Sequence, residues 1–291
     1  MFSLFNPTLL LTYDFLVLCV IASLFVSNTR IKIGILIFTI AVAYAIGSIS
    51  LLSFIPIMGL SLSCYVYYRK GKLSKSLQAT AYIVTLIISL GLLLHKIPGF
   101  NNVKIIDNIN ITSSSAPFSM WLNFDKPVVA IIILLLSGYS LTFKDRDWNR
   151  LIKVALLSGV SCIAVLIIPV LLTDIINYDP KLPNITPIWI INMLFFVCFA
   201  EEVLFRYFIQ GNLGKILKFK YGQYVSIVIT SILFGLVHLP IGGIFAVFAF
   251  ITGLAYGYSY YKTKSIEAAI LTHFTVNFIH FTIFTYPVAQ S

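Results

Sequence analysis

The chain has 291 residues, of which 59% are hydrophobic and 10% are charged, and its mean hydropathy is +0.97. A soluble domain has no need for so much apolar surface, so a soluble globular protein is excluded. The cations that give a formal net charge of +10 occur in short clusters between apolar runs, as the positive-inside rule describes for membrane proteins, and this distribution argues against a nucleic-acid partner.

Ten apolar runs follow one another, and most have the roughly 18 to 20 residues that a helix needs to cross a bilayer. The first begins near Leu9 and is expected to be a retained span, because no basic residue precedes it and no small-residue cleavage site clearly follows. The others are predicted at 33–49, 50–68, 77–95, 127–143, 154–173, 187–211, 222–239, 241–261 and 266–285. The fold class is therefore predicted as all-α, a polytopic membrane bundle of about 8 to 10 spans; the stretch 31–68 forms either two short spans or one re-entrant hairpin.

Loops are assigned to the two sides of the membrane by their charge. The cytoplasmic loops carry the clustered cations Arg30, Lys32, Arg69, Lys70, Lys72, Lys75, Lys144, Arg146, Arg150, Lys153, Lys215, Lys218, Lys220, Lys262 and Lys264. Two polar segments with many turn residues, 96–126 and 174–187, are predicted as external loops. The second loop supplies the domain boundary, which separates N-terminal transmembrane helices of unassigned role (1–183) from a C-terminal four-helix unit (184–291).

The run "FAEEVLFRYF" places three charged residues within six positions of an apolar helix. Each charge at the centre of a membrane helix costs about 2.5 to 3.5 kcal/mol, so something must offset this energy. Glu202 and Arg206 are four residues apart in the order that favours an ion pair. Glu201 has no cation at helical spacing, and an unpaired carboxylate in an apolar setting suits general-base chemistry. The alternative is that both acids only satisfy Arg206 in a network that stabilises the bundle.

Three of the four histidines lie in the same C-terminal third as these carboxylates. His238 ends "FGLVH", and "HFTVN" places His273 and Asn277 four apart on one face of the last helix. Two imidazoles and an amide on the helices that follow a buried carboxylate indicate a site inside the C-terminal four-helix unit. His280 lies on the same stripe as His273 and is expected to meet headgroups, while His95, at the end of a span, is expected at the interface.

The three motifs together resemble those of the CPBP family, the CAAX proteases and bacteriocin-processing enzymes also called Abi proteins. "EEVLFR" is similar to the family's E-E-x-x-x-R motif, "FGLVH" to F-x-x-x-H and "HFTVN" to H-x-x-x-N, and all three occur in the family's order. The resemblance covers about residues 187 to 285. It implies an intramembrane endopeptidase of the glutamate type, a hydrolase whose catalytic bundle is the segment 184–291.

The resemblance also implies a role for each matching residue. Glu201 matches the catalytic glutamate, and His238 matches a histidine that helps to hold or activate the attacking water. His273 and Asn277 match residues proposed to stabilise the oxyanion. Physical chemistry agrees, since peptide hydrolysis needs a base for water and hydrogen-bond donors for the developing negative charge.

Glu202 and Arg206 match the family's supporting pair, and no metal is expected in the site. Zinc remains an alternative, because one carboxylate and two imidazoles are common zinc ligands, but the helical H-E-x-x-H spacing is absent and Asn277 is an unusual zinc ligand. The four cysteines are scattered through apolar stretches, so neither a zinc knuckle nor a disulfide framework is expected.

The function predicted from the sequence is hydrolysis of a peptide bond in a membrane-associated or hydrophobic peptide or protein, lipidated substrates included. The alternatives are a non-catalytic membrane partner such as a bacteriocin-immunity protein, and a proton-coupled transporter, which lacks support because no inverted repeat is visible. The predicted partners are that substrate and the lipid bilayer. Many Ile, Lys, Asn, Phe and Tyr residues suggest an AT-rich bacterial genome, so the predicted location is a bacterial cytoplasmic membrane.

Overall fold

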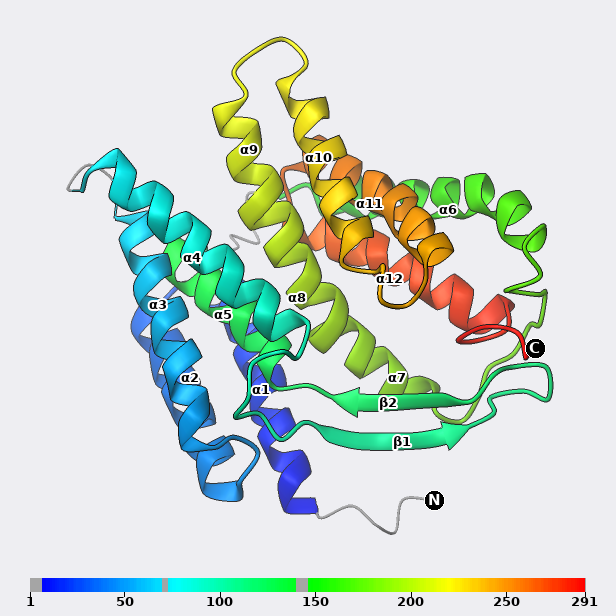
Figure 1. The fold of residues 1–291 in the computed structure, drawn as a ribbon, viewed down its shortest axis with the longest axis horizontal. Coiled ribbons are helices and arrows are strands. Elements are labelled where there is room, and N and C mark those ends of the chain that lie inside the picture. Colours follow the sequence, from blue (N-terminus) through cyan, green and yellow to red (C-terminus); the bar gives the residue numbers. More distant parts are fainter. Residues whose placement is uncertain (1–6, 70–72, 140–145, 291) are drawn as a thin grey trace. The chain divides into compact units, whose positions relative to one another are not determined.

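The structure is a computed structural model that describes residues 7–69, 73–139 and 146–290. In it, each predicted apolar run contains a helix, which confirms the predicted fold class (Figure 1). Lys70, Lys72 and Lys144 of the predicted cytoplasmic clusters lie outside the described residues. Apart from the run predicted at 187–211, which is described below, the α-helices are α1 (Pro7–Phe25), α2 (Thr29–Ile46), α3 (Phe54–Tyr68), α4 (Lys75–Leu93), α5 (Asp125–Ser137), α6 (Trp148–Leu171), α10 (Gly222–Leu236), α11 (Gly243–Thr263) and α12 (Ile266–Ile283).

Within the described residues, seven helical stretches are long and apolar enough to cross a membrane, so the chain is an integral membrane protein. They are Thr29–Ile46, Leu51–Tyr68, Lys75–Leu93, Trp148–Leu171, Thr186–Ile216, Gly243–Thr263 and Ile266–Ile283. The apolar helical stretches Leu9–Phe25 and Gly222–Leu236 are shorter. Helix α5 has 13 residues and is about 20 Å long, which is less than the thickness of a hydrocarbon core of about 30 Å.

The helix ends follow from local sequence. The Asn28 side chain accepts hydrogen bonds from the backbone N–H groups at the start of α2, and Ser74 and Asp147 cap α4 and α6 in the same way. Gly47 and Gly138 end α2 and α5 in the left-handed conformation, which glycine adopts without steric strain. Polar cap residues and glycines therefore set the boundaries that the apolar pattern leaves open.

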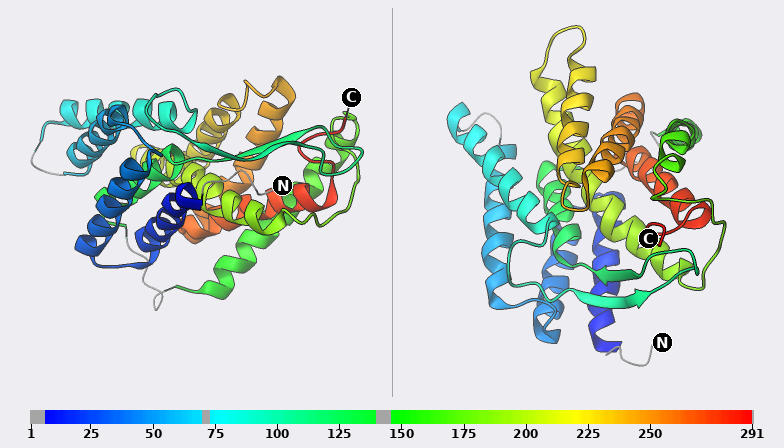
Figure 2. Two further views of the ribbon diagram at one scale, coloured as in Figure 1. Left: turned by 90° about the horizontal axis from the view of Figure 1, so that it is seen from below. Right: turned by 45° about the vertical axis from the view of Figure 1, so that its right-hand side comes forward.

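The predicted external loop 96–126 contains a two-stranded sheet that the sequence analysis did not predict. Its strands are β1 (Val103–Ile109) and β2 (Phe118–Leu122), and they run in opposite directions (Figure 1). In both views of Figure 2 the strands run alongside each other. β-Branched and aromatic residues in "VKIIDNI" and "FSMWL" favour strands, but the turn residues around them dominate the composition of the segment.

The chain divides into two compact units. The first comprises Met1–Ile105, Trp121–Arg146 and Phe195–Leu204, and the second comprises Ile106–Met120, Asp147–Leu194 and Phe205–Ser291. In the first unit, α5 packs against α1, α3 and α4. In the second unit, α11 packs against α6, α10 and α12. The long helical stretch Thr186–Ile216 contributes residues to both units.

Glycines allow the helices of the second unit to approach closely. A Cβ atom on Gly235 of α10 would lie 2.7 Å from the carbonyl oxygen of Ala246 on α11. A Cβ atom on Gly253 of α11 would lie 3.2 Å from the Cβ of Ser231 on α10. Gly253 belongs to the small-xxx-small pattern "GLAYG", which is the pattern that permits close contact between membrane helices.

Hydrogen bonds join the loops at one end of the second unit. The Asp179 carboxylate accepts a hydrogen bond from Thr112 Oγ1 at 2.6 Å and lies 3.4 Å from Lys181 Nζ. Burial by itself raises the pKa of Asp179, but the Thr112 hydrogen bond and the Lys181 charge lower it more, so the net pKa is below the usual value. The contribution of this carboxylate to stability is therefore present at neutral pH and is lost as the pH falls through its lowered pKa.

We predict that Gly235→Ala lowers the free energy of unfolding by about 1–3 kcal/mol, because the added methyl group meets backbone atoms of α11. The measurement is chemical unfolding of the detergent-purified chain. Gly34→Ala in α2 is the control, since nothing lies within 4 Å of its added methyl group and alanine favours the helix. Equal stability of the two variants would contradict the close approach of α10 and α11.

Candidate active site

The helical stretch Thr186–Ile216 carries the predicted carboxylates, and it is not a regular α-helix. Its parts are α7 (Thr186–Ile191), a π-helical segment (Asn192–Cys198), α8 (Phe199–Glu202), a second π-helical segment (Val203–Gln210) and α9 (Gly211–Ile216). In the most apolar 18 residues of this stretch 61% of the residues are buried, whereas the corresponding share is 22% in α2 and 28% in α4 and α6. π-Helical turns are rare and occur often at functional sites, so the wide turns on both sides of the carboxylates mark this segment.

Two side chains fix the ends of this stretch within the second unit. Trp189 of α7 is fully buried and stacks on Phe281 of α12, with 4.2 Å between ring centroids and an interplanar angle of 10°. The buried Gln210 donates a hydrogen bond from Nε2 to the backbone carbonyl of Gly257 on α11, at 2.9 Å. A stacked aromatic pair at one end and an amide hydrogen bond at the other restrict the sliding and rotation of the helix.

Glu201 is paired with a cation, contrary to the prediction from sequence. Lys126 of α5 places its Nζ 3.6 Å from Glu201 Oε1, and both side chains are largely buried. The two residues are far apart in sequence, so helical spacing gave no sign of the pair. Because an ion pair removed from water is screened weakly, the contact with Lys126 restricts the orientation of the Glu201 side chain.

A polar cluster holds the beginning of α5, next to Lys126. Asp125 Oδ2 lies 2.6 Å from His95 Nδ1, and Asp125 Oδ1 accepts a hydrogen bond from Asn102 Nδ2 at 3.2 Å. Asn102 in turn accepts a hydrogen bond from the backbone N–H of Phe124 at 2.9 Å. His95, which we expected at the membrane interface, therefore helps to fix the first turn of the helix that carries Lys126.

Glu202 and Arg206 are both fully buried. They were predicted as an ion pair with α-helical spacing, but the residues from Val203 onward are π-helical, which changes the angle between positions four apart. The Arg206 guanidinium lies over two aromatic rings, 5.2 Å from the Phe234 centroid and 5.8 Å from that of Tyr256. Aromatic faces attract a cation, so the two rings offset part of the energy needed to bury this charge. The ion pair itself stays a prediction.

Phe234 is the centre of an aromatic cluster that joins the histidines of the second unit. Its ring centroid lies 4.7 Å from that of His238 and 5.9 Å from that of His273, whose ring it meets edge-on at 89°. Tyr256 stacks on His273 with centroids 4.4 Å apart and an angle of 14°. Both imidazoles are therefore oriented by rings from α10 and α11.

His238 lies beyond the last turn of α10, in the turn that leads to α11, and not within a helix as predicted. Its Nδ1–H donates a hydrogen bond to the Phe234 carbonyl oxygen at 2.7 Å. Since a carbonyl oxygen only accepts, the proton is on Nδ1, and Nε2 of the neutral ring is an acceptor. The side chain is half-buried, so it is neither sealed in the core nor fully exposed.

The predicted residues of α12 occupy successive turns of one helix. His273 is 4% exposed, and one turn later the half-buried Asn277 donates a hydrogen bond from Nδ2 to the Met193 sulfur at 3.2 Å. A thioether is a weak acceptor, so this contact orients the amide and gives it up readily to a stronger acceptor. His280 meets the ring of Tyr286 edge-to-face, with centroids 5.1 Å apart, which is a packing contact.

Sequence reasoning missed Lys126 and the role of Tyr256. Tyr256 is 1% exposed and stacks on His273. Its neighbour Tyr258 is 43% exposed, as an interfacial residue would be. Positions two apart on a helix point in different directions, and this periodicity was the signal that separates the two tyrosines. For Lys126 the sequence contained no comparable signal.

Among the described residues, no group of three or more His, Cys, Asp or Glu side chains is arranged to hold a metal ion. The four cysteines are buried and unbonded to one another.

Comparison with protein-family models gives one match. Residues 183–279, about a third of the chain, match the model described as type II CAAX prenyl endopeptidase Rce1-like. This C-terminal part is therefore similar to the CPBP family of CAAX proteases. The matched range contains every residue of the three CPBP motifs, from Glu201 to Asn277. Neither the curated proteins nor the solved structures contain a match to the chain.

The similarity to CAAX prenyl endopeptidases indicates a protease, and the apolar helices indicate that it lies in a membrane. The match ends before the last turn of α12, and it does not include the segment that contains Lys126. Lys126 is thus a feature of this chain that lies outside the CPBP match.

We predict that Phe234→Leu lowers the free energy of unfolding by about 1–3 kcal/mol, because leucine fills much of the volume but loses the ring contacts with Arg206, His238 and His273. Phe219→Leu is the matched control, since Phe219 is 54% exposed. The measurement is chemical unfolding of both purified variants. An equal effect of the two substitutions would contradict the central place of Phe234.

Proposed function

We propose that this protein is a metal-free intramembrane endopeptidase in which Glu201 activates water for attack on a peptide bond. The observation that carries the proposal is the CPBP match over the three motifs, together with the burial and partners of the motif residues. Glu201 is a carboxyl group oriented by the nearby Lys126, and His238 is a half-buried imidazole with a defined tautomer. These are the properties that a general base and its helper need.

The proposed reaction starts with a water molecule held by Glu201 and His238 Nε2. Glu201 takes a proton from the water while the oxygen attacks the carbonyl carbon of the substrate, and the C=O electrons move to the oxygen. His273 and Asn277 donate hydrogen bonds to this oxyanion. When the tetrahedral intermediate collapses, the C–N bond breaks and the proton on Glu201 passes to the leaving amine. No Ser or Cys nucleophile takes part.

Glu202 and Arg206 are proposed to support this site without touching the substrate. Arg206 is buried over Phe234 and Tyr256, the rings that orient His238 and His273. A change at Arg206 therefore reaches both histidines through the aromatic cluster. We propose that the C-terminal segment 184–291 is the catalytic bundle and that the helices before residue 184 contribute Lys126 to the reaction.

The proposed substrate is a membrane-associated or hydrophobic peptide or protein, and prenylated and other lipidated peptides are included. Apolar side chains cover most of the outer surface of the membrane helices, so a substrate that partitions into the bilayer reaches the protein without leaving the hydrocarbon. We propose a bacterial cytoplasmic membrane as the location, on the composition of the chain.

Glu201→Gln is expected to lower kcat by about 10²–10⁴-fold, because the amide cannot accept the proton from water. The measurement is cleavage of a panel of fluorogenic peptides, prenylated and unprenylated, by the purified chain. The control is a chelator added to the wild type, which leaves activity unchanged if the reaction needs no metal. Full activity of Glu201→Gln would contradict the proposal, and loss with the chelator would favour zinc.

Lys126→Met is expected to lower kcat roughly 10- to 100-fold at unchanged KM, because Glu201 loses the charge that orients it. Lys126→Arg keeps the charge and is expected to retain most of the activity. Lys75→Met, which removes a lysine from the first turn of α4, is the control and is expected to leave kcat unchanged. A change in KM alone would show that Lys126 contacts the substrate and does not position Glu201.

A further inference from the structure

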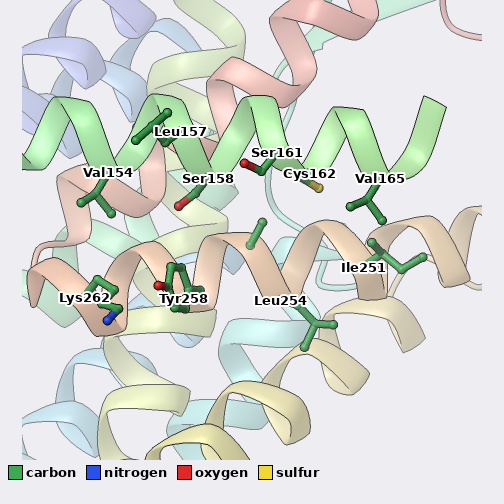
Figure 3. Close-up of a pocket in the computed structure, with 11 residues that line it drawn as sticks. Val154, Leu157, Ser158, Ser161, Cys162, Val165, Ile251, Leu254, Tyr258 and Lys262 are labelled. Atoms are coloured by element: carbon green, nitrogen blue, oxygen red, sulfur yellow. The ribbon is translucent and has the colours of Figure 1, made fainter.

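A groove on the second unit lies between α6 and α11, away from the motif residues. Its volume is about 620 Å³, and Figure 3 shows its two sides formed by one helix each. Val154, Leu157 and Val165 come from α6, and Ile251 and Leu254 come from α11. Both helices are long and apolar enough to cross a membrane, so the groove runs within the bilayer. None of its lining residues belongs to the three motifs.

The groove is open to the surroundings of the helices along its length. Leu157 is 56% exposed and Val165 is 65% exposed, although both are apolar. Two hydroxyl groups, those of Ser158 and Ser161, line the same groove on α6 (Figure 3). Hydroxyl groups in hydrocarbon are stabilised when they find acceptors, so the serines favour an occupant that is apolar but carries a few acceptor oxygens.

One end of the groove is basic. Lys262 lines the groove at the last turn of α11, and Arg150 Nη2 donates a hydrogen bond to the backbone carbonyl of Lys262 at 3.4 Å. Arg150 is four residues before Val154 on α6, so it continues the stripe that lines the groove. Two cations therefore meet at this end.

The described carboxylates closest in sequence to Arg150 and Lys262 are not shown in an ion pair with these two side chains. Asp147 accepts a hydrogen bond from the backbone N–H of Arg150 at 2.9 Å, which caps α6. Glu267 accepts a hydrogen bond from the Ser265 hydroxyl at the start of α12. The cations are thus left to attract an anion from outside the chain.

The dimensions of the groove fit one chain of a phospholipid. Lys262 and Ile251 are 11 residues apart, which is about 16 Å along α11. Tyr258, whose ring lies 5.5 Å from Lys262 Nζ, is about 6 Å deeper than Lys262 and faces Ser158 across the groove (Figure 3). Going inward, the occupant therefore meets cations beside Val154, then Ser158 and Tyr258, and then Ser161 and the aliphatic side chains toward Val165 and Ile251 (Figure 3).

We propose that this groove binds an anionic phospholipid of the leaflet that faces the basic end. The phosphate lies between Arg150 and Lys262, the ester carbonyl oxygens accept hydrogen bonds from Ser158 and Ser161, and one acyl chain follows the groove toward Ile251. Basic pockets between transmembrane helices bind anionic headgroups by this charge complementarity. The site is separate from the motif residues, so it can be occupied while the protease acts.

The test is native mass spectrometry of the delipidated full chain in detergent, with phosphatidylglycerol and phosphatidylcholine of equal acyl chains as probes. The wild type is expected to retain one phosphatidylglycerol with roughly tenfold or greater preference. Arg150→Gln/Lys262→Gln is expected to abolish the preference. The control Lys218→Gln/Lys220→Gln removes two cations from the loop between α9 and α10 and is expected to keep it.

A groove-filling variant separates the possible occupants. Ser161 is exposed, so Ser161→Phe is compatible with folding, and it is expected to reduce retention of phosphatidylglycerol by blocking the acyl chain. The proposal is overturned if the wild type shows no lipid preference or if the control double variant loses it equally. It is also overturned if Ser161→Phe leaves lipid retention intact and raises KM for peptide cleavage, because the occupant is then the substrate.

Discussion

The structure depends on how an apolar bundle accommodates the charges of one helix. Glu201, Glu202 and Arg206 are all buried, and each ion in hydrocarbon costs several kcal/mol without compensation. In the first unit, Lys126 approaches Glu201, and the cluster of His95, Asn102 and Asp125 fixes the helix end that carries this lysine. In the second unit, aromatic faces accept the Arg206 guanidinium. Interactions of two different kinds thus make these charges tolerable, one ionic and one aromatic.

The aromatic cluster also explains why the motif residues include a phenylalanine. Phe234 contacts the rings of His238, His273 and Tyr256, and its carbonyl oxygen fixes the tautomer of His238. Because rings pack at restricted angles, such a cluster orients imidazoles without adding polar groups that would need partners of their own. Gly235, the next residue, brings α10 close enough to α11 for these contacts. The close packing of α10 against α11 is therefore also what orients the histidines of the second unit.

Polar side chains on membrane helices find their partners in different places at the proposed lipid groove and inside the bundle. Inside the bundle, polar side chains find partners within the protein, as Gln210 does with Gly257. On the outer side of α6 and α11, Ser158, Ser161 and Lys262 face a groove, and their partner is proposed to come from the bilayer. The outer surface is thus not uniform, and charge at one end of the groove distinguishes it from the apolar surface around it.

The sequence by itself determined the all-α membrane fold, the approximate limits of the helices and the family resemblance of the C-terminal part, because apolar run length and ordered motifs are local properties. It also indicated the close contact at Gly253. Lys126, the stacking of Tyr256 on His273, the π-helical turns around Glu201 and the position of His238 beyond α10 were decided by tertiary structure. These features depend on which helices meet, and residues as distant as 126 and 201 become neighbours only through the packing of α5 against α8. Spacing along one helix cannot encode a partner that another helix supplies.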